Sequence, residues 1–122
     1  MADTKKDKLI ELLQEMQKIG DIKGSIVVSR DGLVIASNIT DIDADTFAAM
    51  SAAMQGAAET AASELKQGDV DQIIIETGKG KIISTGAGKR AILVILTSRS
   101  INLGLALLEM GRTAEKIGSI LR

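Results

Sequence analysis

One segment of the sequence, from Thr46 to Ala58, contains no ionisable side chain and consists mostly of alanine, serine, glycine and methionine. This composition favours a helix, which continues past the charged residue Glu59 as far as Glu64 and Lys66. A helix on the surface of a monomeric domain carries an apolar stripe and an opposite charged face. Because the charged face is missing here, we predict that both sides of the helix are covered, one by the protein itself and one by a second surface.

Helical spacing divides this segment into two faces. At about 100° per residue, one stripe contains Phe47, Met50, Met54, Ala58, Ala61 and Leu65, and we expect it to pack on the protein's own sheet. The other surface contains Ala49, Ala52, Ala53, Gly56, Ala57 and Thr60. Small residues let another backbone approach closely, so this surface is predicted to be an interface. A merely alanine-rich helix is the alternative, but Gly56 in mid-helix argues against it, since glycine costs about 1 kcal/mol relative to alanine there.

The overall composition excludes several functional classes. A chain of 122 residues fits a single domain, placed at residues 1–122. Its net charge of −1 and its lack of tryptophan and tyrosine give no support for nucleic-acid binding. Without histidine and cysteine there is no ordinary zinc site, no thiol chemistry and no Ser-His nucleophile. We therefore expect no enzyme, no catalytic residues, no cofactor and no bound metal.

The amino-terminal eight residues are polar and charged, and no apolar run approaches the length of a membrane span. The sequence therefore predicts neither a signal peptide nor membrane insertion. The expected location is the cytoplasm.

The remaining periodicities predict the order helix, two strands, helix, three strands, helix. The predicted elements are a helix at 4–19, strands at 25–29 and 33–37, the helix that follows Asp45, strands at 70–77, 81–85 and 90–97, and a helix at 102–121. Asp31-Gly32 between the first two strands is a hairpin signal, since both turn residues must tolerate positive φ. Apolar residues at consecutive positions from Ile92 to Leu96 indicate cover on both faces of the sheet. The predicted fold class is α+β: one five-stranded antiparallel sheet between helices.

The strand at 70–77 is expected at the sheet edge, where an uncovered apolar strand is an aggregation hazard unless it pairs. Self-pairing about a two-fold axis removes the hazard, so Val70, Gln72 and Ile74 join the predicted interface.

Short motifs give little support for ligand binding. Gly86-Ala87-Gly88-Lys89 resembles the end of a phosphate-binding loop, but Ile83 and Arg90 stand where that motif needs Gly and Ser or Thr. Three acidic residues, Asp41, Asp43 and Asp45, lack the glycine and glutamate of a calcium loop and suit the start of a helix instead. The basic residues Lys79, Lys81, Lys89 and Arg90 cluster in sequence; a solvated rim is the ordinary interpretation, and a surface for an acidic partner is the alternative.

Taken in order, several of these segments resemble the roadblock (dynein light chain) family over nearly the whole chain. The resemblance rests on the hairpin at 24–37, the alanine-rich helix, the strand at 91–97 and the Asn102-Leu103-Gly104 helix start. It implies a sandwich of helices around the sheet, like the profilin and longin architectures. It also implies dimers that join sheets edge to edge and lay their second helices side by side.

Two functions follow from this resemblance. The first is a homodimeric regulator or scaffold of a Ras-like small GTPase, acting by docking. The second is a structural adaptor of a cytoplasmic assembly that does not sense the nucleotide state. The second helix contains no arginine, which excludes an arginine finger from that helix.

Overall fold

The computed structural model describes residues 4–122 and contains three helices and five strands. The first three residues belong to the polar segment in which no signal peptide is predicted, and they lie outside the described residues. The elements in order are α1 (Lys5–Gln17), β1 (Ile22–Ser29), β2 (Val34–Ile39), α2 (Ala44–Glu64), β3 (Gln72–Glu76), β4 (Gly80–Ala87), β5 (Ala91–Ser98) and α3 (Leu103–Ile120).

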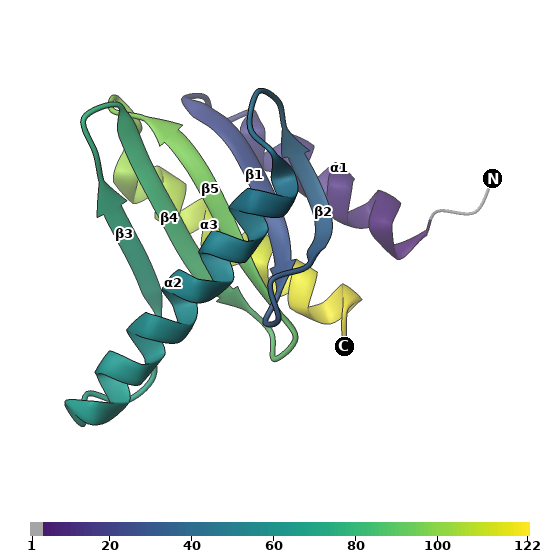
Figure 1. Ribbon diagram of the computed structural model, residues 1–122. Coiled ribbons are helices and arrows are strands. Elements are labelled where there is room, and N and C mark those ends of the chain that lie inside the picture. The colour runs from purple at the N-terminus through teal and green to yellow at the C-terminus, as the bar shows by residue number, and fades with distance from the viewer. Residues whose placement is uncertain (1–3) are drawn as a thin grey trace.

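All five strands form one antiparallel sheet in the order β2-β1-β5-β4-β3. Helices α1 and α3 cover one face of this sheet and α2 crosses the other (Figure 1). The predicted α+β class and element order are confirmed. Strand β3 lies at one edge and β2 at the other.

The consecutive apolar residues of β5 divide between two cores. Leu93 and Ile95 are fully buried in the core under α1 and α3, and Ile92 and Val94 are fully buried on the α2 side. Successive side chains of a strand point to opposite faces, so a central strand that is covered on both sides needs apolar residues at every position.

Each helix begins at a side chain that accepts a hydrogen bond from its first turn. Thr4 forms a reciprocal capping box with Asp7, Asp43 caps α2, and Asn102 caps α3. The predicted role of an acidic residue at the start of the second helix is therefore confirmed for Asp43. Asp41, by contrast, lies in the preceding turn with φ of 67°.

Two turns differ from the sequence expectation. In the β1–β2 hairpin only Gly32 takes a positive φ, 89°, whereas Asp31 does not. Strand β4 continues through Gly86, which was expected to break it, and ends at Ala87. The turn is delayed because Gly88, with φ of 79°, provides the left-handed conformation one residue after the strand.

Candidate protein–protein interface

Helix α2 packs obliquely on the sheet, chiefly against β1 and β2, and its carboxyl-terminal end extends beyond the strands (Figure 1). Its buried residues are Ala48, Ser51 and Gln55. Gln55 accepts a hydrogen bond at 3.2 Å through Oε1 from the Ser84 hydroxyl of β4. The sheet-facing side of α2 is thus small and partly polar.

The stripe that was expected to face the sheet lies on a flank of α2 instead. Met50 is 62% exposed and Leu65 is 70% exposed, while Phe47 and Met54 are half-buried. At 100° per residue, the prediction is wrong by about a quarter of a turn. The reason is that α2 has no charged face in its central part, so its hydrophobic pattern does not define a single buried side.

Most of the predicted small-residue interface is open to solvent. Ala49, Ala53, Gly56, Ala57 and Thr60 are exposed, and a side chain built at Gly56 would meet nothing within 4 Å. Ala52 differs, since it is half-buried and its Cβ lies 3.5 Å from the position of a Cβ on Gly32 in the hairpin turn.

Of the predicted residues at the sheet edge, Gln72 and Ile74 do not face α2. Val70 is half-buried just before β3, Gln72 is exposed, and Ile74 is 37% exposed. Ile74 pairs with Ile83, whose side chain lies in the core under α1 and α3, so Ile74 and Gln72 point to that face.

Sequence reasoning missed the two β3 residues that share the α2 side of the sheet. Ile73 and Ile75 pair with Ser84 and Ile82, which belong to that face, and both are half-buried. Their period-2 spacing was visible in the sequence, but only the register with β4 tells which face they occupy.

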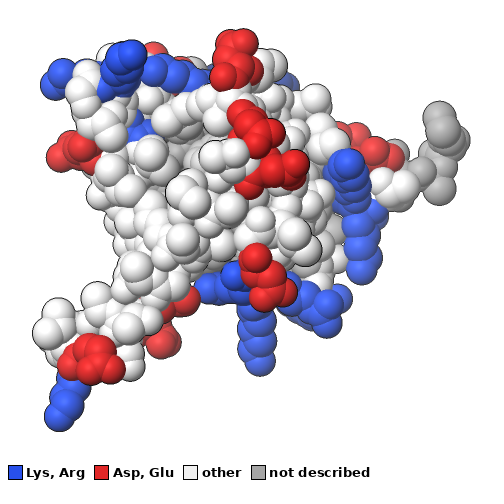
Figure 2. All heavy atoms as spheres, in the orientation of Figure 1, with Lys and Arg blue, Asp and Glu red and all other residues white. Residues whose placement is uncertain are grey.

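Charge is sparse over this surface and gathers around it (Figure 2). At the start of α2, hydrogen bonds from the Thr46 hydroxyl and backbone to the Asp43 carboxylate lower the pKa of Asp43 below 3.8. Along the other flank, Arg30 of the β1–β2 turn pairs with Glu59 at 3.1 Å and donates to the Gly88 carbonyl at 3.2 Å. The tertiary structure therefore places an arginine beside α2 although the helix itself contains none.

The four clustered basic residues are separated in space. Lys79 and Lys81 lie at the start of β4, and Lys89 and Arg90 follow its end, so the eight-residue strand holds the two pairs at opposite ends of the sheet. The four residues therefore do not form one basic surface, because closeness in sequence across a strand is not closeness in space.

Residues 4–122 contain no group of three or more acidic, histidine or cysteine side chains arranged to hold a metal ion. None of the helices in this described part has the length and apolar character that a bilayer crossing requires.

The sequence of this chain matches a family model and close relatives. The model for the Roadblock/LC7 domain matches residues 8–97. The uncharacterized proteins MJ1340 and MJ0310 of Methanocaldococcus jannaschii are 47% and 46% identical over 107 residues, which cover 87% of this chain and 93% of each relative.

Solved structures show the same fold at lower identity. The gliding protein MglB from Thermus thermophilus superposes with a TM-score of 0.88 at 20% identity, covering 98% of this chain and 93% of that one. A Roadblock/LC7 domain from Streptomyces avermitilis gives 0.86 at 24% identity, covering 91% and 95%. Profilin II of Acanthamoeba castellanii gives 0.67 at 16% identity, covering 95% and 98%, so the profilin-like architecture is confirmed. With the family model spanning most of its length and relatives above 45% identity, this chain belongs to the Roadblock/LC7 domain family.

Proposed function

We propose that this protein is a homodimer that regulates or scaffolds a Ras-like small GTPase by docking on it, without catalytic chemistry of its own. The observation that carries the proposal is the uncharged surface that α2 and the neighbouring strands leave partly uncovered (Figure 2). Exposing such a surface to water costs free energy, so it is typical of a protein whose surface is covered by another protein. The action on a small GTPase places the protein in the cytoplasm.

The dimer would form first along the β3 edge. Strand β3 has one neighbour, β4, and its other side presents unpaired backbone groups. A second copy related by a two-fold axis can pair there antiparallel, which continues the sheet across both copies. The fold neighbour described as MglB with a tetrameric arrangement, with a TM-score of 0.89, supports assembly of this fold into multimers.

The flank of α2 would complete the dimer. Met50 and Leu65 are exposed on this flank, and Ile73 and Ile75 of β3 are only half-buried on the same side of the sheet. The helix of a second copy could cover all four residues. Methionine suits this role because its flexible side chain adapts to an irregular neighbour.

The small-residue face of α2 would then point outward from the paired helices. We assign Ala49, Ala53, Gly56, Ala57 and Thr60 to the docking of the GTPase, together with the half-buried Ala52. Family membership supports a GTPase as partner. Since α2 contains no arginine, docking acts by favouring one conformation of the partner's switch segments, and the shift equals the difference in binding free energy between the two nucleotide states.

Light scattering behind a sizing column tests the dimer. We expect twice the mass of the chain at micromolar concentration, and a stable monomer would reject the dimer.

Nucleotide dependence tests the regulator. A pull-down from the native lysate with a GTP analogue or GDP identifies the partner, and calorimetry then compares its two loaded forms. We expect affinities that differ by about tenfold or more, equivalent to about 1.4 kcal/mol. Equal affinities would support the structural adaptor instead.

A further inference from the structure

A cavity of about 650 Å³ opens between the β4–β5 turn and the last turns of α3, away from the α2 surface. Its lining includes Ala87 and Ala114, which belong to the core under α1 and α3. Helix α2 covers the opposite face of the sheet, although Gly88 of the cavity lining accepts a hydrogen bond from Arg30, which also pairs with Glu59 on the flank of α2.

Two glycines in the cavity lining mark the place where the turn and α3 come closest. A side chain on Gly88 would lie 3.0 Å from the Gly118 Cα atom, and one on Gly118 would lie 3.2 Å from the Gly88 nitrogen. The turn and the helix therefore touch through backbone alone.

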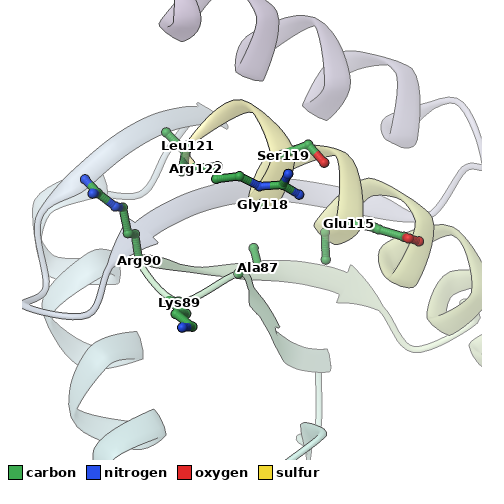
Figure 3. Close-up of a pocket in the computed structure, with 10 residues that line it drawn as sticks. Ala87, Lys89, Arg90, Glu115, Gly118, Ser119, Leu121 and Arg122 are labelled. Carbon is green, nitrogen blue, oxygen red and sulfur yellow. The ribbon is translucent and has the colours of Figure 1, made fainter.

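The mouth of the cavity is basic. In Figure 3 the Arg122 side chain extends over the last turn of α3, the Arg90 side chain rises from the β4–β5 turn and points outward, away from Gly118, and Lys89 is turned away from α3. The four ion pairs of residues 4–122 involve none of these three cations. The dipole of α3 accounts for a cation at its carboxyl end, such as Arg122, but it does not account for Arg90 in the β4–β5 turn.

The residues that line the cavity limit the chemical class of ligand that it can bind. Arginine binds carboxylates and phosphates with paired hydrogen bonds, but a phosphate ion would fill only a small part of this volume and would not use the apolar part of its lining. A nucleotide would lack an aromatic platform, because the only aromatic residue, Phe47, packs in the core on the α2 side. Glu115 also lines the cavity and disfavours a ligand that is anionic throughout.

The geometry points to a docking site for an acidic peptide segment of a partner protein, whose carboxylates bind Arg90 and Arg122 while a small apolar side chain contacts the half-buried Leu121. A scaffold with this site holds a second protein while α2 remains free. The site does not depend on the dimer or on the GTPase.

Titration of the full chain with capped peptides, followed by amide resonances, tests the site. The probe is an eight-residue peptide that alternates glutamate with alanine or leucine, and its control has glutamine in place of glutamate. We expect the glutamate peptide to shift resonances around Gly88, Arg90 and Ser119. Absence of binding, or equal binding of the glutamine peptide, would overturn the proposal.

Matched variants distinguish binding of the peptide in the cavity from nonspecific electrostatic attraction to the protein. Arg90→Glu and Arg122→Glu should each weaken binding about tenfold or more, while Lys79→Glu, the same change at the far end of β4, should leave it nearly unchanged. Ser119→Phe narrows the cavity from an exposed position without changing charge and should also abolish binding. An equal loss with Lys79→Glu would contradict the site.

Two competitors complete the test. Inorganic phosphate at the peptide concentration should not displace the peptide, and vesicles containing phosphatidylserine should not bind the protein through Arg90. Displacement by phosphate would identify a free-anion site, and binding of vesicles that Arg90→Glu abolishes would identify a membrane surface. Either result would overturn the peptide site.

Discussion

The two faces of the sheet differ in how completely the chain covers them. Within residues 4–122, sixteen buried apolar residues form one continuous core under α1 and α3, whereas five form the core under α2. On the first face, the apolar residues of α1 and α3 pack against the apolar residues of the strands. On the second, α2 offers Ala48, Ser51 and Gln55 to the strands and leaves Met50 and Leu65 in solvent. The first face stabilises the fold, and the second is suited to an interface.

This difference has a physical basis in the side chains. Burial of apolar area contributes roughly 25 cal/mol per Å², so the large residues under α1 and α3 supply most of the stabilisation. Alanine and serine bury little area, and the hydrogen bond between Gln55 and Ser84 adds about 1 kcal/mol in such a setting. The attachment of α2 to its own sheet is therefore the weaker of the two.

The largest expected effect is a loss of stability from a substitution in the core under α1 and α3. Leu93→Ala, at a fully buried position of β5, should lower the free energy of unfolding by about 2–5 kcal/mol, because it leaves a cavity. Urea denaturation measures this change. The matched control is Leu108→Ala on α3, where the side chain is 53% exposed and the loss should stay below about 1 kcal/mol. Similar losses in both variants would contradict the contrast between core and surface.

A charge on the flank of α2 tests the other face. Met50→Glu should shift the dimer toward monomer by about tenfold or more, because the glutamate would lose water in the interface. It should leave the fold intact, since Met50 is 62% exposed in the single chain. Light scattering over a dilution series measures the shift, with Leu108→Glu as the control. A dimer unaffected by Met50→Glu would remove this flank from the interface.

A substitution at Gly56 distinguishes the small-residue face of α2 from the flank that we assign to the dimer. Open space surrounds this glycine, so Gly56→Leu should fit and stabilise the helix by up to about 1 kcal/mol. We expect the variant to remain a dimer and to bind the GTPase less tightly. Thermal melting measures the stability, light scattering the mass, and calorimetry the affinity for the GTPase. Glu59→Ala, which removes only a half-exposed ion pair, should change GTPase binding less. If Gly56→Leu produced monomers, the small-residue face would belong to the dimer.

The smallest effect concerns the start of α2 and depends on pH. The pKa of Asp43 is lowered below 3.8 by hydrogen bonds from Thr46, so its contribution to stability is complete above that pH and is lost as pH falls through the lower folded value. Asp43→Asn keeps an acceptor at the cap but does not titrate. The melting temperature of the wild type should exceed that of the variant near neutral pH, and the difference should shrink below pH 3.8. A difference that is independent of pH would refute the assignment.

Much of the fold could be predicted from local patterns. The hairpin at Gly32 and the consecutive apolar residues of β5 depend on neighbouring residues and on the two-fold repeat of a strand, which any single sequence displays. Edge placement of β3 was also expected, and the sheet order confirms it.

The candidate interface was only partly visible in the sequence. The missing charge on α2 predicts that a second surface covers the helix, and this stays a prediction, whereas the predicted direction of the side that faces the sheet was wrong. Ile73 and Ile75 were missed because their face follows from the pairing with Ile82 and Ser84 on another strand. Arg30 was missed because it reaches α2 from a turn 29 residues before Glu59.

The sequence by itself determined the order of the elements, the family and the presence of a helix whose central part carries no charge, because these depend on spacing within short segments. Only the tertiary structure decided how far α2 is rotated, which β3 residues lie beside it, and that Lys79 and Arg90 stand at opposite ends of β4. Each of these depends on contacts between distant segments. Where a helix has no charged side, many rotations bury similar apolar area, and the packing partner selects among them.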